Sequence, residues 1–346
     1  MSFRDILAAI AAATALGLAF IAIKFGVREA PPLLLTALRF AFAAFPAILF
    51  VKAPRASPAL VVLYGLLIGV GQFGLLFLSI GLGMPVGLAS LVIQLQAFIT
   101  ILLAWALMGE RPRAAQAVGA SIAFLGIVAI GATRLGGASF GPFAMVIGAA
   151  ICWGAGNMVG KMAGPIDMFA FTIWSSLAAP VPLLALSLLF EDGRTLPALM
   201  HPSWVLAACV AGLAYGGTVL GFGLWSRLLA HHSAAKVAPF ALLIPVVGMV
   251  AGRLVFNEPL GLFELLGAVL VMAGLVVNIF GDRLLAPFLP TPLWGRAGEG
   301  GRAGLSDIEF ALPFDRSARP PPLPNPPPQG GREFLVSIKE SDQTRA

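Results

Sequence analysis

The chain has 346 residues, of which 59% are hydrophobic and only 11% charged, and its formal net charge is +6. Soluble domains have roughly 45–50% apolar and about 25% charged residues, so this composition excludes an ordinary soluble protein. Apolar runs of about 20 residues, long enough to cross a hydrocarbon core of about 30 Å as a helix, recur along the chain. The short alternating segments of a membrane β-barrel do not occur, so we predict an all-α polytopic membrane protein.

Charged, glycine and proline clusters divide the apolar region into ten predicted transmembrane helices. The first resembles a secretory signal, but its apolar run of about 18 residues exceeds the usual 7–15 and leads into further spans. We therefore expect it to remain a membrane helix. The predicted spans are 5–25, 31–51, 58–81, 84–108, 112–132, 142–163, 167–190, 203–225, 234–256 and 260–281.

An internal repeat relates the two halves of this region. An offset of 148 residues places Glu110 on Glu258, Gly119 on Gly267 and Gly126 on Gly274. A fainter match, at an offset of 137, places Leu16-Gly17 and Lys24 on Trp153-Gly154 and Lys161. Because five helices are an odd number, two five-helix copies must enter the membrane from opposite sides, as an inverted repeat suited to alternating access. We predict repeats at 1–135 and 136–282.

Residues 283–346 form a third region of different character. They contain no span, and their core reads WGRAGEGGRAG and then ARPPPLPNPPPQGGR. Proline and glycine at this density cannot bury a core, so we expect a disordered tail. PPPLPNPPP could alternatively form a polyproline helix for a partner.

The distribution of basic residues favours a cytoplasmic N-terminus and C-terminus. With that orientation eight basic residues lie at inner ends and loops and five at outer ones, a bias in the direction of the positive-inside rule. The inner set is Arg4, Lys52, Arg55, Arg111, Arg113, Lys161, Arg227 and Arg283, and the outer set is Lys24, Arg28, Arg134, Arg194 and Arg253.

Arg39 is the clearest candidate for substrate binding. It lies eight residues into the second predicted helix, about 12 Å deep at 1.5 Å per residue. An ionisable group near the bilayer centre costs roughly 2.5–3.5 kcal/mol on insertion scales, so its presence needs a reason. It could bind a substrate carboxylate, or it could be a structural arginine held by backbone carbonyls or by a carboxylate such as Glu110.

Uncharged polar and aromatic residues within the spans complete a predicted cavity lining. Gln96 and Thr100 are four residues apart and share a helix face. Each uncharged polar residue of the lining could alternatively serve only to form hydrogen bonds between helices. The predicted substrate-binding set is Arg39, Gln94, Gln96, Thr100, Trp153, Asn157, Trp174 and Ser175.

A second set is predicted to line the pathway or to act in gating. Lys24 and Lys161 close equivalent helices, although terminal lysines often only extend to the interface. Pro239 and Pro245 interrupt the ninth span, and such breaks are tolerated where a helix lines a cavity. The full set is Lys24, Lys161, Pro239, Pro245, Glu110 and Glu258.

Other motifs carry little weight. Gly137-Ala138-Ser139-Phe140-Gly141 has the G-x-S-x-G spelling of hydrolases, but it lies between membrane helices rather than at a strand-to-helix turn. Cys152 and Cys209 lie in different spans, and the histidines are few, so no disulfide and no metal site are predicted. Every acidic residue of the membrane region lies near a helix end or in a loop. Unless Glu110 or Glu264 is drawn inward, proton coupling lacks an obvious carrier, and facilitated diffusion or exchange stays open. No enzymatic activity, cofactor or nucleic-acid partner is expected; the expected partners are the lipid bilayer and a small-molecule substrate.

Several stretches resemble the drug/metabolite transporter superfamily, specifically its EamA-type ten-helix members. The resemblance covers about residues 5–282 and is especially close to exporters of cysteine and O-acetylserine. The family's first-helix pattern W-G-x-N-F-x-x-x-K here becomes Leu16-Gly17-Leu18-Ala19-Phe20 with Lys24, without the usual tryptophan and asparagine. The stretches are PPLLLTALRF (31–40), GMPVGLASLVIQLQAFITI (83–101), GERPRAAQAVGA (109–120), WGAGN (153–157), VAPFALLIPVVGM (237–249) and NEPLGLFELLGAVLVMAGL (257–275).

The resemblance implies an inner-membrane exporter with two inverted five-helix repeats around a central cavity. The alternatives are a carrier of another solute class, such as aromatic amino acids, nucleosides or drugs, and a membrane-embedded enzyme. The enzyme would need a cluster of His, Asp or Ser at one membrane face, and the sequence lacks such a cluster.

Overall fold

The computed structural model describes residues 1–133, 140–191, 193–232, 234–258 and 261–284. These residues contain helices and no strand, and ten of their helical segments are long and apolar enough to cross a membrane. The prediction of an all-α polytopic membrane protein is therefore confirmed. The predicted tail lies outside the described residues from 285 onward, and so does most of the Gly137–Gly141 motif.

The helices follow the predicted order along the chain. The first five spans are α1 (Phe3–Glu29); α2 (Pro32–Ala44) with η1 (Ala47–Leu49); α3 (Pro58–Gly65), η2 (Leu66–Gly74) and α4 (Leu75–Gly81); α5 (Val86–Val92), η3 (Ile93–Leu95) and α6 (Gln96–Met108); and α7 (Ala114–Ala132). The second five are α8 (Phe140–Met162); α9 (Met168–Ser175), η4 (Ser176–Ala178) and α10 (Pro180–Phe190); α12 (Trp204–Ala211), η5 (Gly212–Phe222) and α13 (Gly223–His231); α14 (Ala234–Ala241) and α15 (Leu243–Phe256); and α16 (Leu262–Leu284). The short helix α11 (Thr195–Met200) precedes the eighth span.

The first span is longer than its apolar run. It was predicted as 5–25, whereas α1 runs from Phe3 to Glu29. Ser2 and Asp5 form a capping box in which each side chain accepts a hydrogen bond from the other's backbone N–H. This cap satisfies amide groups that would otherwise lack partners, so the helix begins before the hydrophobic stretch does.

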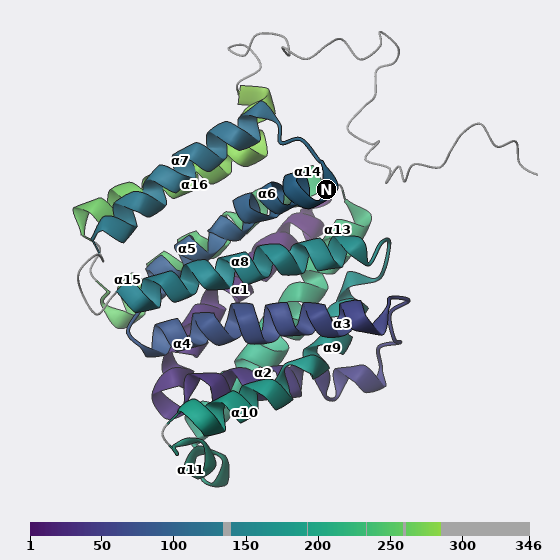
Figure 1. The fold of residues 1–346 in the computed structure, drawn as a ribbon, viewed down its shortest axis with the longest axis vertical. Coiled ribbons are helices and arrows are strands. Elements are labelled where there is room, and N and C mark those ends of the chain that lie inside the picture. The colour runs from purple at the N-terminus through teal and green to yellow at the C-terminus, as the bar shows by residue number, and fades with distance from the viewer. Residues whose placement is uncertain (134–139, 192, 233, 259–260, 285–346) are drawn as a thin grey trace, which may run out of the picture. The chain divides into compact units, whose positions relative to one another are not determined.

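The contact between α7 and α16 shows how the repeats are related. A methyl group at Gly119 would lie 2.6 Å from the Gly274 carbonyl oxygen, and one at Gly126 would lie 2.6 Å from that of Gly267. The two contacts exchange under the 148-residue repeat, so a pseudo-two-fold rotation relates the halves. The same two contacts show that α7 and α16, which lie side by side in Figure 1, run in opposite directions. This antiparallel pairing places the axis across the helices, and the ten spans form two inverted five-helix repeats.

Two helix irregularities also recur at equivalent positions in the halves. The third and eighth spans each contain a π-helical segment, η2 and η5, in which the backbone hydrogen bonds span one residue more than in an α-helix. The fourth span changes to a 3-10 turn at Ile93–Leu95, and the ninth is interrupted at Leu242 between α14 and α15. Position 94 corresponds to position 242 at the 148-residue offset, so the two breaks are equivalent.

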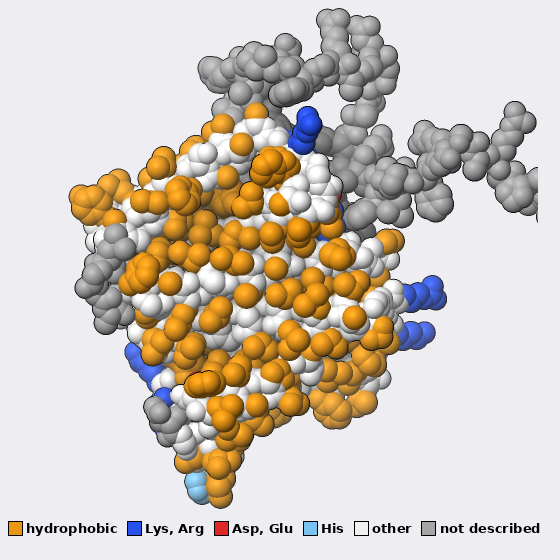
Figure 2. All heavy atoms as spheres, viewed as in Figure 1, with side chains coloured by type: hydrophobic (Ala, Val, Ile, Leu, Met, Phe, Trp, Pro, Cys, Tyr) orange, Lys and Arg blue, Asp and Glu red, His pale blue; other side chains and the backbone are white. Residues whose placement is uncertain are grey.

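The outer surface is suited to lipid. Figure 2 shows a mostly apolar face with Lys and Arg side chains at its margins. Large apolar side chains such as Phe124, Leu189 and Leu254 are well exposed on the spans. Such a surface would be costly in water but is favourable against hydrocarbon, and basic side chains are commonly found at the edge of the apolar band.

Candidate functional site

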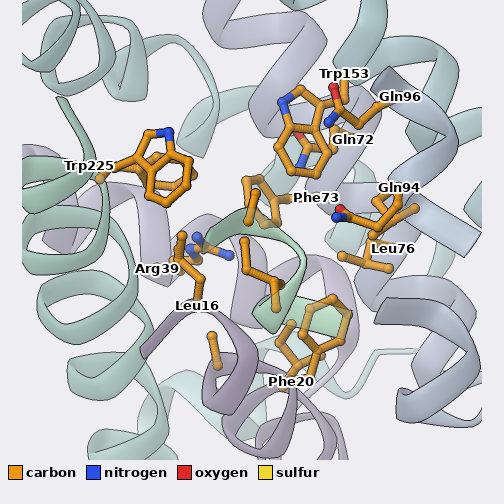
Figure 3. A pocket seen from close by; sticks show the side chains of 16 residues that line it. Leu16, Phe20, Arg39, Gln72, Phe73, Leu76, Gln94, Gln96, Trp153 and Trp225 are labelled. Atoms are coloured by element: carbon orange, nitrogen blue, oxygen red, sulfur yellow. The ribbon is translucent and has the colours of Figure 1, made fainter. Parts of the chain in front are cut away.

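A cavity of about 170 Å³ lies among the helices and draws its wall from both repeats (Figure 3). The first repeat contributes α1, α2, η2, α4, η3 and α6, and the second contributes α8, η5, α13, α14 and α15. The broken parts of the fourth and ninth spans both reach it. Its lining residues are Leu16, Ala19, Phe20, Ile23, Arg39, Gln72, Phe73, Leu76, Ile93, Gln94, Gln96, Trp153, Phe222, Trp225, Ala241 and Ile244.

Arg39 is the one charged residue among the described residues that line the cavity. It is 2% exposed, and its guanidinium carbon lies 3.8 Å from the centre of the Phe73 ring. Its Nε donates a hydrogen bond to Thr218 Oγ1 at 3.3 Å, whereas its Nη1 is buried and has no hydrogen-bond partner among the described residues. An aromatic face and a hydroxyl stabilise a buried cation only in part. The guanidinium therefore retains the capacity to bind an anion within the cavity.

Arg39 is not paired with Glu110, which was the alternative, structural role considered for it. Glu110 instead accepts a hydrogen bond from Lys161. Thr218, which does bond Arg39, lies in η5 of the second repeat. The arginine thus stacks on Phe73 of its own repeat and is hydrogen-bonded to the opposite half of the molecule, beside the cavity.

A hydrogen-bonded group forms the polar side of the wall. Asn157 Nδ2 donates to Gln96 Oε1 at 2.8 Å and to Thr100 Oγ1 at 3.0 Å, and Thr100 Oγ1 donates to the Gln96 carbonyl oxygen at 2.7 Å. Because its oxygen is occupied, the Gln96 side chain presents its amide hydrogens for other partners. Gln96 lines the cavity together with Trp153 and Gln72 (Figure 3). Asn157 and Thr100 are outside the lining and orient Gln96 from behind it.

The predicted binding residues divide into three groups. Arg39, Gln94, Gln96 and Trp153 line the cavity, and Asn157 and Thr100 support Gln96. The structure does not bring Trp174 and Ser175 to the cavity. Trp174 donates from Nε1 to the Val51 carbonyl oxygen at 3.0 Å, and Ser175 packs with its backbone against Gly65. Their role in substrate binding stays a prediction with no contact to support it.

The predicted gating residues form two ion pairs and one helix break. Lys24 Nζ lies 3.9 Å from Glu258 Oε1, and Lys161 pairs with Glu110. Pro239 lies inside α14, and Pro245 is buried near the start of α15. The prolines thus flank the interruption at Leu242, next to the lining residues Ala241 and Ile244.

The sequence analysis missed the contributions of the π-helical segments. Gln72 and Phe73 lie in η2, and Thr218 and Phe222 lie in η5. It also missed Trp225, which faces the cavity from α13. The available signal was weak: Gln72 and Thr218 are isolated polar residues in apolar runs and lie at nearly the same point of equivalent spans. Such residues tend to face the protein interior.

Known proteins resemble this chain along the membrane region. The sequence profile of the EamA-like transporter family matches residues 4–132 and 141–280. A Salmonella typhimurium protein named probable amino-acid metabolite efflux pump is 38% identical over 291 residues, which cover 82% of this chain and 97% of the relative. An Escherichia coli K12 protein of the same name is 38% identical over 292 residues, with the same coverage. A protein of known crystal structure shares the fold at 20% identity and a TM-score of 0.58, over 82% of this chain and 99% of that one.

Proposed function

The chain belongs to the EamA-like transporter family, and from this premise we propose that it exports small amino-acid metabolites, such as cysteine and O-acetylserine, by alternating access. It is a multi-pass membrane protein. We place it in the inner membrane with both termini in the cytoplasm, and we assign the two five-helix units to residues 1–135 and 136–282. The names of the 38% identical relatives support amino-acid metabolites as the substrate class.

The observation that carries this proposal is the unpartnered Nη1 of Arg39 in an otherwise apolar and amide-lined cavity. Within the part of the chain that the structure describes, no Asp or Glu lines the cavity. A substrate carboxylate would supply the missing acceptor and neutralise the buried charge, and hydrogen bonds between ionised partners are about twice as strong as neutral ones. Carboxylate recognition by Arg39 is therefore the central step of binding.

The remaining polar atoms of a small amino-acid metabolite would meet the amide side of the wall. Gln94 and Gln96 offer both donors and acceptors, and Trp153 and Trp225 offer ring faces to an apolar or cationic part of the solute. The equivalent breaks in the fourth and ninth spans, with Pro239 and Pro245, provide the joints at which the cavity changes its exposure.

Ligand-induced stabilisation of the purified full chain tests the carboxylate assignment. Cysteine and O-acetylserine should raise the melting temperature, because a ligand at 100 times its Kd stabilises the folded state by about 2.7 kcal/mol. Their methyl esters, which lack the carboxylate, should produce no comparable rise. Equal stabilisation by acids and esters would contradict the role of Arg39. If neither acid stabilises a folded preparation, these solutes are not the substrates.

A further inference from the structure

The two ion pairs occupy equivalent positions in the two repeats. Lys24 corresponds to Lys161, and Glu258 corresponds to Glu110. Lys24 contacts Glu258 of the other half, and Lys161 contacts Glu110 of the other half. Each pair is therefore the image of the other under the pseudo-two-fold rotation. Because that axis lies in the membrane plane, the pairs lie at opposite membrane faces, named here the Glu258 face and the Glu110 face.

The surroundings of the two pairs differ. The side chains of Lys24 and Glu258 are 18% and 12% exposed, whereas those of Lys161 and Glu110 are 33% and 51% exposed. Glu258 also accepts hydrogen bonds from the backbone N–H groups of Val86 at 3.0 Å and Gly87 at 3.2 Å. These amides begin α5 and have no acceptor within their own helix, so the carboxylate ties the start of the fourth span to the end of the ninth.

Close backbone packing seals the same face. A methyl group at Gly248 would lie 2.3 Å from Ser90 Oγ, and one at Gly252 would lie 2.6 Å from Glu258 Oε2. One at Gly87 would lie 3.2 Å from Met249 Cα. Glycines thus let α5 and α15 touch along the segment between the cavity and the Glu258 face. The lining residues Trp225 and Ala241, by contrast, lie in the parts of their spans nearer the Glu110 face.

We propose that Glu258 and Glu110, each beside its paired lysine, control the two alternate gates of the carrier. A gate is closed when its carboxylate binds the N-terminus of the facing half-helix, so this structure holds the Glu258 gate closed. This inference rests on the proposed function and adds the residues that control access. In the opposite state Glu258 releases Val86 and Gly87, and α5 separates from α15. By the repeat symmetry, Glu110 then binds the N-terminus of α14 and closes its own face.

The equivalent breaks explain how one face closes as the other opens. The fourth span consists of α5 toward the Glu258 face and α6 toward the Glu110 face, joined at Ile93–Leu95. The ninth span consists of α14 toward the Glu110 face and α15 toward the Glu258 face, joined at Leu242. Each joint borders the cavity, so the half-helices on its two sides can move separately. The carboxylates select which pair of half-helices is in contact.

Accessibility of a cavity residue tests this proposal without any substrate. Cys152 and Cys209 are replaced by alanine in the full chain, and Ala241→Cys supplies a single reporter thiol in the cavity wall. A membrane-impermeant maleimide is applied to each side of membrane vesicles in turn. Glu258→Gln should raise the labelling rate from the Glu258 face severalfold, because it weakens the closed gate. Glu110→Gln should leave that rate at or below the parental value. Arg194→Gln, at an exposed position just before α11 and at the same membrane face, is the control and should change nothing.

Equal responses of the two variants, or no response of either, would overturn the proposal. Lys24→Met provides a second test if Glu258→Gln does not fold, because it removes the ion pair while leaving the carboxylate on α5; it should also raise labelling from the Glu258 face. The outcome is separable from the export function. Unchanged labelling with intact transport refutes the gates alone, and the expected labelling without transport of amino-acid metabolites refutes the proposed function alone.

Discussion

A buried arginine defines the chemistry of the cavity because its charge is only partly compensated. Arg39 stacks on Phe73 and bonds Thr218, and both partners are neutral. Replacement by lysine would keep the charge but lose the planar fork that binds both carboxylate oxygens. Arg39 was evident from sequence, since a cation eight residues into an apolar span is rare. Its partners were not, because Phe73 and Thr218 come from spans that hydropathy alone cannot place beside α2.

The orientation of Gln96 depends on Asn157. Asn157→Ala should free Gln96 to adopt other rotamers and leave its oxygen without a donor from α8. A lost hydrogen bond of this kind changes the free energy by about 0.5–1.5 kcal/mol, so we expect substrate affinity to fall roughly twofold to tenfold.

Concentration-dependent efflux measures this change, with Ser121→Ala as the control. Ser121 is exposed on α7 and bonds only its own helix at Ala117. If Asn157→Ala and Ser121→Ala give the same half-saturation concentration, the polar side of the wall does not contribute to recognition.

At the scale of the elements, hydropathy was sufficient to predict the spans but not their interruptions. The predicted first span, 5–25, differs from the observed helix by two residues at its start and four at its end. The agreement is close because the length of an apolar run reflects membrane thickness. The prolines predicted the break in the ninth span. The fourth span breaks at Ile93–Leu95 with no proline or glycine there, so its break arises from tertiary packing around the cavity rather than from local sequence.

Glycine at the α7–α16 crossing is required by close contact between backbones. Gly126→Val would force side-chain atoms closer to the Gly267 carbonyl oxygen than van der Waals contact allows. The clash is with backbone, which cannot move aside easily. Overpacking typically costs 1–3 kcal/mol, so the melting temperature should fall by several degrees. Gly141→Val is the matched control, because a methyl group at Gly141 meets nothing within 4 Å. Equal melting temperatures for the two variants would show that the crossing is not a tight contact.

At the scale of the whole molecule, the repeat was the most informative sequence feature. Two short alignments, around Glu110 and Glu258 and around Lys24 and Lys161, anticipated the inverted pair of five-helix units. They did not reveal which residues of one half meet the other. Glu191, for example, accepts from the N–H groups of Leu33 and Leu34 across about half the chain, a contact that depends on the assembled bundle.

The proposed membrane orientation rests on the distribution of basic residues and is directly testable. Alkaline phosphatase fused after Met200, in the predicted outer loop, should be active, and the same fusion after Arg111 should be inactive. The reversed pattern would place the N-terminus outside. It would also exchange the sides assigned to the Glu258 and Glu110 faces, while leaving their pseudo-symmetry intact.

The most direct test of the central claim compares efflux of labelled cysteine and O-acetylserine from proteoliposomes that contain the full chain or its Arg39→Gln variant. Arg55→Gln, in the exposed loop between the second and third spans, serves as the matched control. We predict carrier-dependent efflux for the parent chain and for Arg55→Gln, and a loss of roughly tenfold or more for Arg39→Gln, because charge-assisted hydrogen bonds contribute about 1.5–3 kcal/mol. Undiminished efflux by folded Arg39→Gln protein would contradict carboxylate recognition at this cavity.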